Sequence, residues 1–322
     1  MEKKYELLDG AGEDTNVTIG GRTFALKRLR ALRDFGDVKK GDFGGYIEKE
    51  ENLSHISNCW VYDSAKVYGN ASVYEDATIR ENALIGGCAE VYGGARIFGY
   101  AKVSGCAEVY GDVEVSDHAE VYGKAEIYGN ARLEGQAKVY EGAIVAANAT
   151  VAGQASVYED AYVHGNAFIF GHAEVYGDAD VWGRVNIYGN AKVHEASEVC
   201  GGVDVWGDAE ICGDAEICGN GEIRGHAKIC GYAKTYGSFD ICMDAYIEER
   251  SSLMIFASIG SEYGYLTAFS DTKGNIICTR GCSSGTLEEF EEAVKKTHGN
   301  NKYAEEYLMA IAMIENRFKN RG

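Results

Sequence analysis

Cysteine and histidine, the residues best able to act as nucleophiles, bases or metal ligands, recur in this sequence at fixed intervals. Three cysteine pairs are each separated by 18 positions: Cys88 and Cys106, Cys200 and Cys218, and Cys212 and Cys230. Cysteines held at the spacing of neighbouring strands could form disulfides or supply thiolates to zinc. Because no CxxC motif accompanies the pairs and no secretion signal is evident, the favoured interpretation is reduced thiols in small surface positions.

These intervals follow from a six-residue repeat that begins at Val61 and runs to the hexad of Ile247. An aliphatic residue recurs at every sixth position, with Thr235 as the exception, and a small residue, nearly always Ala, stands two positions earlier. Residues two apart point to the same side of an extended segment, and the Gly-Asn and Glu-Asp pairs between them suit tight turns. Three hexads make one 18-residue coil, so the sequence predicts a mainly β protein, a single-stranded parallel β-helix of about 10–11 triangular coils.

The composition excludes several classes of partner. The chain has 322 residues with 31 Lys+Arg against 50 Asp+Glu, a net charge of −19, and it has 42 Gly but no Pro. An acidic surface is poorly suited to direct contact with nucleic acid or anionic membrane. No run of 18 apolar residues exists, and the first residues lack the apolar core of a signal peptide. We therefore expect a cytoplasmic protein that binds neither nucleic acid nor membrane directly.

The ends of the repeat divide the chain into three predicted domains: an N-terminal cap at 1–60, the β-helix at 61–252 and a C-terminal α+β module at 253–322. Open ends of a solenoid expose unpaired strand edges, so both ends need covering.

The C-terminal module has its own predicted elements. Three short strands are expected, at 253–259, 265–270 and 275–279. Thr286 and Glu289 form a capping-box pattern that opens a helix ending at Gly299, and a second helix with an apolar stripe follows.

The hexads resemble the hexapeptide-repeat proteins, which form left-handed parallel β-helices, and the handedness is taken from that resemblance. Four segments near the N-terminus resemble the start of the YdcK-like hexapeptide-repeat proteins, an uncharacterised bacterial and phage-associated group: Asp34-Phe-Gly-Asp-Val-Lys-Lys-Gly-Asp42, Gly44-Gly-Tyr-Ile-Glu48, Glu51-Asn-Leu-Ser54 and Cys59-Trp-Val-Tyr-Asp63. Residues 281–290 resemble a C-terminal module of phage and prophage proteins. These resemblances imply a β-helix, often trimeric, without an established activity.

Many hexapeptide-repeat proteins are acyltransferases, which resemble one another in a loop that interrupts the repeats and a histidine base at a subunit boundary. Here the register is unbroken, so no such loop is expected. His118, His172 and His226 share one column but lie three coils apart, about 14 Å at coil spacing, too far to share one ion. We therefore assign no catalytic residue, metal site or cofactor, and favour a non-enzyme.

One face of the predicted β-helix has an unusual outward surface. Three stacked glutamates, Glu90, Glu108 and Glu126, stand beside a tyrosine column that includes Tyr92, Tyr110 and Tyr128. Like charges stacked on neighbouring strands are destabilising. Solubility is the simpler explanation, but the same residues could bind a basic protein, and we predict them as the partner-binding residues.

Further along the repeats the outward positions turn apolar. The predicted oligomer interface comprises Ile144, Tyr162, His164, Phe168, Phe170 and Tyr188. Outward Phe and Ile gain nothing in water, so contact with another copy is expected, with a trimer favoured by the resemblance.

Together these features predict a non-enzymatic, oligomeric interaction protein that presents acidic and aromatic ladders to a macromolecular partner. The phage resemblance implies antagonism of a host defence factor, through a basic host protein, as one role. Two alternatives stay open. An acyltransferase would bind coenzyme A, and a sponge for small signalling nucleotides would need basic pockets, for which Lys and Arg are sparse on the repeats.

Overall fold

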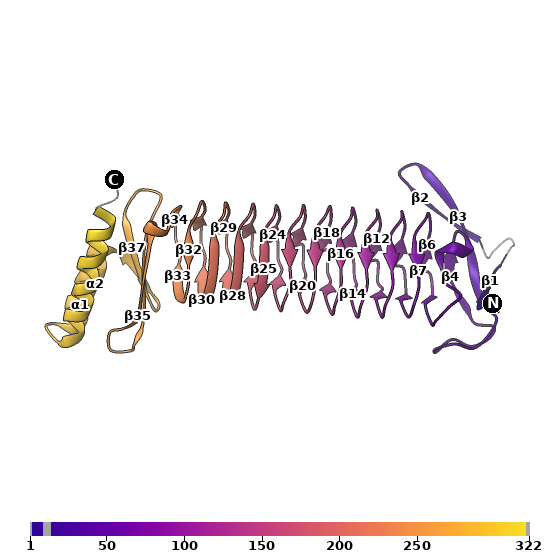
Figure 1. Ribbon diagram of the computed structural model, residues 1–322, viewed down its shortest axis with the longest axis horizontal. Coiled ribbons are helices and arrows are strands. Elements are labelled where there is room, and N and C mark those ends of the chain that lie inside the picture. Colours follow the sequence, from indigo (N-terminus) through magenta and orange to yellow (C-terminus); the bar gives the residue numbers. More distant parts are fainter. Residues whose placement is uncertain (1, 9–13, 320–322) are drawn as a thin grey trace. The chain divides into compact units, whose positions relative to one another are not determined.

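The computed structural model describes residues 2–8 and 14–319. The chain divides into two compact units, Met1–Gly171 and His172–Gly322, here called the N-terminal and the C-terminal unit. Each contains parallel β-helix coils, and the C-terminal unit also contains an antiparallel sheet and two helices (Figure 1). The predicted fold class, a left-handed parallel β-helix with an N-terminal cap and a small C-terminal α+β domain, is confirmed.

In the N-terminal unit the coils are built from two-residue strands on three faces. The first face comprises β6 (Lys66–Val67), β9 (Leu84–Ile85), β12 (Lys102–Val103), β15 (Glu120–Val121), β18 (Lys138–Val139) and β21 (Ser156–Val157). The second face comprises β7 (Ser72–Val73), β10 (Glu90–Val91), β13 (Glu108–Val109), β16 (Glu126–Ile127), β19 (Ile144–Val145) and β22 (Tyr162–Val163). The third face comprises β5 (Trp60–Val61), β8 (Thr78–Ile79), β11 (Arg96–Ile97), β14 (Glu114–Val115), β17 (Arg132–Leu133), β20 (Thr150–Val151) and β23 (Phe168–Ile169).

The aliphatic residue of each hexad points inward, as predicted. Val91, Val109 and Ile127 are fully buried, and so are the Ala residues two positions before them. Strands on adjacent coils pair in parallel and in register, for example Val91 with Val109. Each fully buried Val or Ile contributes about 1.5–3 kcal/mol relative to an exposed one. This core fixes which side chains of every coil face outward.

Antiparallel strands cover the first coil of the N-terminal unit. They are β1 (Tyr5–Leu7), β2 (Asp14–Ile19), β3 (Arg22–Ala31) and β4 (Phe43–Ile47), and the short helix η1 (Glu50–Asn52) follows them. The strand β3 pairs with the other three, and β4 pairs in parallel with β6. The strand edge at the start of the first face is therefore paired.

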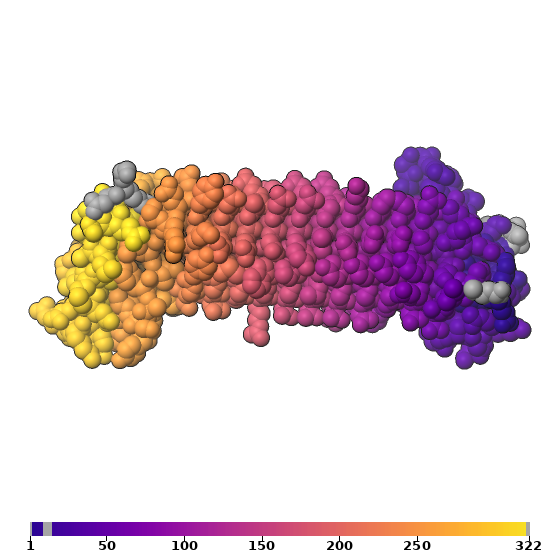
Figure 2. All heavy atoms as spheres, in the orientation of Figure 1, coloured from indigo at the N-terminus to yellow at the C-terminus, as the bar shows by residue number. Residues whose placement is uncertain are grey.

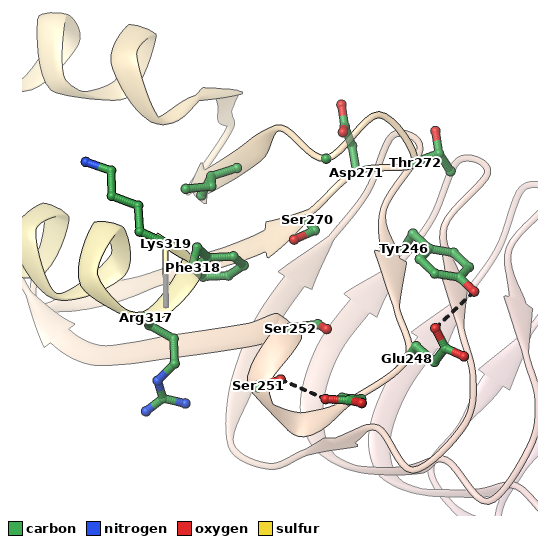
Figure 3. A pocket seen from close by; sticks show the side chains of 13 residues that line it. Tyr246, Glu248, Ser251, Ser252, Ser270, Asp271, Thr272, Arg317, Phe318 and Lys319 are labelled. Atoms are coloured by element: carbon green, nitrogen blue, oxygen red, sulfur yellow. Dashed lines mark hydrogen bonds between the residues drawn. The ribbon is translucent and has the colours of Figure 1, made fainter. Parts of the chain in front are cut away.

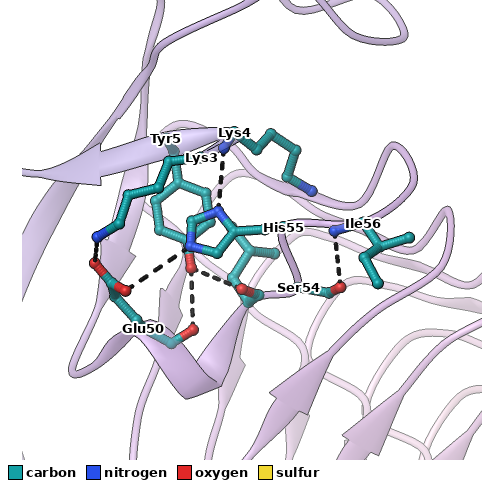
Figure 4. A network of polar contacts seen from close by, with 8 residues as sticks. Lys3, Lys4, Tyr5, Glu50, Ser54, His55 and Ile56 are labelled. Carbon is teal, nitrogen blue, oxygen red and sulfur yellow. Dashed lines mark hydrogen bonds and ion pairs between the residues drawn. The ribbon is translucent and has the colours of Figure 1, made fainter. Parts of the chain in front are cut away.

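A polar network ties the start of the chain to the segment before the first coil (Figure 4). The hydroxyl of Tyr5 donates to the carbonyl of Leu53 at 2.6 Å, and the backbone N–H of Lys4 donates to His55 Nδ1 at 3.2 Å. The Lys4 side chain is buried, and its Nζ donates to the carbonyl of Cys59 at 2.9 Å. Burial lowers the pKa of Lys4. This network fixes the N-terminal strands against the β-helix.

The C-terminal unit continues the hexads with some longer strands. Its coils comprise β24 (Glu174–Val175), β25 (Asp180–Gly183), β26 (Asn186–Ile187), β27 (Lys192–Val193), β28 (Glu198–Val205), β29 (Glu210–Ile211), β30 (Glu216–Ile223), β31 (Lys228–Ile229), β32 (Lys234–Thr235), β33 (Ser238–Ile241) and β34 (Tyr246–Ile247). The strands β28 and β30 run without a break around the corner between two faces, and all eight of their residues pair in register. In these two coils the pairing between adjacent coils therefore continues through the corner.

An antiparallel sheet and two helices complete the C-terminal unit after the short helix η2 (Arg250–Ser252). The sheet comprises β35 (Leu253–Ile259), β36 (Gly264–Ser270), β37 (Ile276–Arg280) and β38 (Ser283–Thr286), followed by α1 (Leu287–His298) and α2 (Lys302–Lys319). The predicted capping box is confirmed, because Thr286 Oγ1 accepts from the N–H of Glu289 and Glu289 Oε2 accepts from that of Thr286. The strand β38 was not predicted from the sequence.

The cysteine interpretation needs correction. Disulfides join Cys88 to Cys106 and Cys200 to Cys218, so these four residues are not reduced thiols. The 4.7 Å between the α-carbons of each pair is the spacing of adjacent coils, which lies within disulfide range. Among the described residues, neither helix is long and apolar enough to cross a membrane.

Candidate functional site

The predicted partner-binding residues lie on the second face of the N-terminal unit, where a tyrosine follows the strand of each coil. Tyr74, Tyr92, Tyr110 and Tyr128 stand on four successive coils, with neighbouring ring centroids 4.7, 4.8 and 5.3 Å apart. The planes of neighbouring rings are within 9° of parallel. The rings are half-buried, and their mutual stacking restricts the motion of the column.

Three carboxylates stand beside this column. Glu90, Glu108 and Glu126 precede the buried residues of β10, β13 and β16 and pair in register with one another. The hydroxyl of Tyr74 donates to Glu90 Oε2 at 2.8 Å, and Tyr110 donates to Glu126, so each of these phenols contacts the carboxylate of the following coil. Burial, and then the adjacent carboxylate, raise the pKa of both phenols. The four tyrosines and three glutamates are called the Tyr–Glu array below.

In the N-terminal unit the acidic strand residues of the other two faces, Glu114 and Glu120, have cationic partners. On the third face Glu114 lies 2.8 Å from Arg96 and 3.6 Å from Arg132, and on the first face Glu120 lies 2.7 Å from Lys102. No Lys, Arg or His in the described parts of the chain forms such a pair with the carboxylates of the array. The array therefore concentrates negative charge that the fold itself does not neutralise.

The predicted oligomer interface lies partly in each unit. In the N-terminal unit Ile144, Tyr162, His164, Phe168 and Phe170 are all half-buried. The rings of Tyr162 and His164 stack at 4.2 Å, and those of Phe168 and Phe170 stack at 4.5 Å. Ile144 pairs in register with the last carboxylate of the array, so the acidic column leads directly into these apolar residues.

The sixth predicted interface residue, Tyr188, belongs to the C-terminal unit. It is half-buried and stacks on Trp206 with ring centroids 6.0 Å apart. In the view of Figure 2 the atoms of successive coils pack against one another in each unit. The repeats therefore offer ladders and ridges rather than a deep binding cleft on that face.

The histidines that were weighed as bases or ligands are not brought together. His118 is exposed and stacks on Tyr100, while His172 and His226 are exposed at turns. His226 Nδ1 lies 3.4 Å from an oxygen of Asp208. None of these three side chains belongs to a cluster of potential metal ligands within the described residues.

A cluster that sequence reasoning missed lies on the face of the C-terminal unit formed by β24, β27, β29, β31 and β34, called the first face of that unit below. Side-chain ligand atoms of His194, Glu210 and Cys212 all lie within 4.8 Å of one another. His194 Nε2 is 3.2 Å from Glu210 Oε1, and Lys228 Nζ is 2.8 Å from the same oxygen. Burial raises the pKa of the Cys212 thiol to about 12, and the hydrogen bond from Lys228 lowers that of Glu210. The sequence does contain a signal for this cluster, because His194 and Cys212 share the 18-residue spacing of the cysteine pairs.

A cavity of about 1020 Å³ lies in the C-terminal unit between its last coil and α2 (Figure 3). Tyr246, Glu248, Arg317 and Phe318 are among its lining residues. The hydroxyl of Tyr246 donates to Glu248 Oε2 at 3.3 Å. Both of these side chains and Arg317 are exposed, so this cavity is an open surface hollow without a convergent set of buried polar groups.

Comparison with known proteins gives limited information. No family model matches the chain. A stretch of 38 residues is 45% identical to "Uncharacterized acetyltransferase YdcK" of Escherichia coli (strain K12), and the match covers 12% of this chain and 12% of that protein. Together with the observed fold, this partial match supports a hexapeptide-repeat β-helix. The predicted resemblance of the C-terminal module to phage proteins receives no support.

Proposed function

We propose that this protein is a non-catalytic, oligomeric interaction protein of the cytoplasm whose Tyr–Glu array binds a basic macromolecular partner. In this proposal residues 1–60 and 253–322 serve as the end domains of the β-helix at 61–252. A basic host protein, including a host defence factor, is the narrower identity proposed for the partner.

The observation that carries the proposal is the in-register stacking of Glu90, Glu108 and Glu126 without cationic partners. Like charges at this spacing cost stability, and the other two faces show that the same fold readily pairs its carboxylates. A partner's Arg or Lys side chains would neutralise the array.

The β-helix makes the array ready to bind. Its side chains are positioned by strands with fully buried aliphatic residues, and the Tyr rings are fixed by stacking. Binding would therefore order few side chains, which lowers the entropic cost of association. An extended basic segment laid along the coils would meet a carboxylate at each coil, about 4.8 Å apart.

The first test replaces Glu90, Glu108 and Glu126 together by Gln and measures binding of a fluorescent Arg-rich peptide by anisotropy. If each exposed pair contributes about 0.5 kcal/mol, the triple change should weaken binding about tenfold at low salt. Screening should shrink the difference at higher ionic strength. Removing the stacked charges should also raise the unfolding temperature, because the like-charge repulsion disappears.

A matched control replaces Glu114, Glu120 and Glu174 by Gln, which changes the net charge equally but removes carboxylates that are ion-paired to Arg or Lys. This control should keep most of the peptide binding and should lose stability rather than gain it. Equal weakening by both triple variants would show that net charge alone attracts the peptide, and would exclude the array as the binding site.

Oligomerisation through the apolar residues is the second part of the proposal. Phe168→Asp combined with Phe170→Asp should lower the mass measured by light scattering to that of one chain, 34.9 kDa, with an unchanged circular-dichroism spectrum. Thr78→Asp combined with Ser116→Asp adds the same charge to the same face of the N-terminal unit and should leave the mass unchanged. A wild-type protein that is already monomeric would contradict this part.

An acyltransferase is the second candidate function, favoured by the partial match to a protein whose name includes acetyltransferase. This candidate requires binding of acetyl-coenzyme A, which isothermal titration calorimetry would measure directly. Binding that survives the triple Gln change but is lost with the oligomer would favour a site at a subunit boundary over the interaction proposal.

A further inference from the structure

One column of the C-terminal unit brings together residues that prefer transition metals. His194, Cys212 and Cys230 directly follow the paired strands β27, β29 and β31, so they stand on three successive coils of the first face. Their backbone N–H groups donate to the carbonyls of Ile211, Ile229 and Ile247 at 2.9, 2.9 and 2.8 Å. The α-carbons are therefore held at coil spacing by the β-helix itself.

The side chains of this column are sheltered as well as close. The His194 side chain is 12% exposed and Cys212 is 5% exposed. The ring of Tyr176 stacks on that of His194 with parallel planes and centroids 4.6 Å apart, which fixes the orientation of the imidazole. Glu210 lies beside both, and the ligand atoms of His194, Glu210 and Cys212 all lie within 4.8 Å of one another.

Nitrogen, oxygen and sulfur donors of these types are the ones that zinc uses in proteins. Zinc–ligand distances of about 2.0–2.3 Å place two tetrahedral ligands about 3.5 Å apart. Ligand atoms already within 4.8 Å can reach that separation by small side-chain rotations. Lys228, which contacts Glu210 Oε1 at 2.8 Å, also balances charge, because one carboxylate, two thiolates, one ammonium and a divalent ion sum to zero.

We propose that His194, Glu210 and Cys212 bind a zinc-like divalent ion, and that Cys230 on the following coil supplies the fourth ligand. The ion would link three coils of the C-terminal unit from outside their aliphatic core. This site lies in a different unit from the Tyr–Glu array, so it does not depend on the proposed partner binding.

The other cysteine pairs provide an internal contrast. Glu198, Cys200 and Cys218 also bring ligand atoms within 4.8 Å, but their two sulfur atoms are joined in a disulfide and are not available as thiolates. Cys212 and Cys230 share the same 18-residue separation, yet both are free. His194 stands 18 residues before Cys212 in the same column. Neither disulfide-bonded pair has a histidine at the corresponding position.

The test uses Co²⁺ as a spectroscopic probe on the full chain, purified without metal and kept free of strong reductant so that the disulfides persist. The expected result is one equivalent of Co²⁺ bound with a thiolate-to-cobalt charge-transfer band and the intense visible bands of tetrahedral cobalt. Cys212→Ser and His194→Gln should each weaken binding about 100-fold or more, since loss of a ligand exceeds the 10- to 100-fold effect of outer contacts. Zn²⁺ should displace the cobalt and raise the unfolding temperature.

The controls separate this site from its neighbours. Cys200→Ser combined with Cys218→Ser should leave the cobalt spectrum unchanged, and Cys230→Ser should remove part of the charge-transfer intensity. Circular dichroism confirms that each variant is folded, and His194→Gln tests the site without altering a thiol. Absence of the band in the wild-type protein, or its persistence in both Cys212→Ser and His194→Gln, would overturn the proposal.

Discussion

Trp60→Ala should destabilise the N-terminal unit by about 3–5 kcal/mol, the usual cost of removing a fully buried Trp side chain. Trp60 is 1% exposed and belongs to β5, the first strand of the third face. Its ring lies 5.3 Å from that of Phe35 and 6.1 Å from that of Tyr5, both in edge-on contacts. The side chain therefore joins the first coil to the strands that cover it, and its loss leaves a cavity where the coil edge is protected.

The measurement is urea unfolding followed by far-ultraviolet circular dichroism, which does not depend on the tryptophan that is removed. Trp182→Ala is the matched control, because Trp182 is 38% exposed and its loss should cost under about 1 kcal/mol. Limited proteolysis should cleave the Trp60→Ala protein first within the N-terminal strands. Equal stability of the two variants would show that the covering strands do not rely on Trp60.

The buried core of the β-helix could be predicted from the sequence because each hexad repeats the same pattern of small, aliphatic and turn residues. A small residue and an aliphatic residue two apart must share one side of an extended segment, and the turn residues set the corner. Thr235, the one polar residue at an aliphatic position, is nevertheless buried, because the register of its neighbours leaves it no other place.

Features that depend on contacts between coils could not be read in the same way. Three cysteine pairs share one sequence separation, yet two are disulfides and the pair Cys212 and Cys230 is free. Whether a pair forms a disulfide depends on the orientation of the two side chains and on their neighbours. The sequence separation gives no information about either. The unbroken strand β28 and the short strand β38 likewise form through pairing partners rather than through a local apolar pattern.

The candidate site was predictable in position but not in its bonds. The columns of Glu90 and Tyr92 follow from the 18-residue coil, and the structure places both on one face. The hydrogen bond from Tyr74 to Glu90 joins residues 16 positions apart on two adjacent coils. Whether such a bond forms depends on the direction of both side chains. The proximity of His194 to Glu210 has the same 16-residue separation and was missed for the same reason.

The second large effect is expected at Gly45→Ala, where β4 lies against the first coil. A Cβ at this position would lie 2.5 Å from the carbonyl oxygen of Ala65 and 2.8 Å from that of Tyr62. The same Ala65 oxygen accepts a hydrogen bond from the N–H of Tyr46 at 2.9 Å. The added methyl group would displace this oxygen and so disrupt the hydrogen bond that attaches β4 to the coil. Backbone atoms cannot turn aside as a side chain can, and the expected loss of stability is about 3 kcal/mol.

Gly274→Ala is the control that separates crowding from backbone conformation. Gly274 has φ of +83° with nothing within 4 Å of an added Cβ, so its substitution should cost only the strain of that conformation, about 1 kcal/mol. Gly45 does not have a positive φ. Any loss of stability larger than that of the control therefore measures the steric contact with the coil. Urea unfolding of both variants gives the comparison. A smaller loss for Gly45→Ala than for Gly274→Ala would mean that β4 can move away from the first coil without cost, and that the N-terminal strands are not a fixed part of the β-helix.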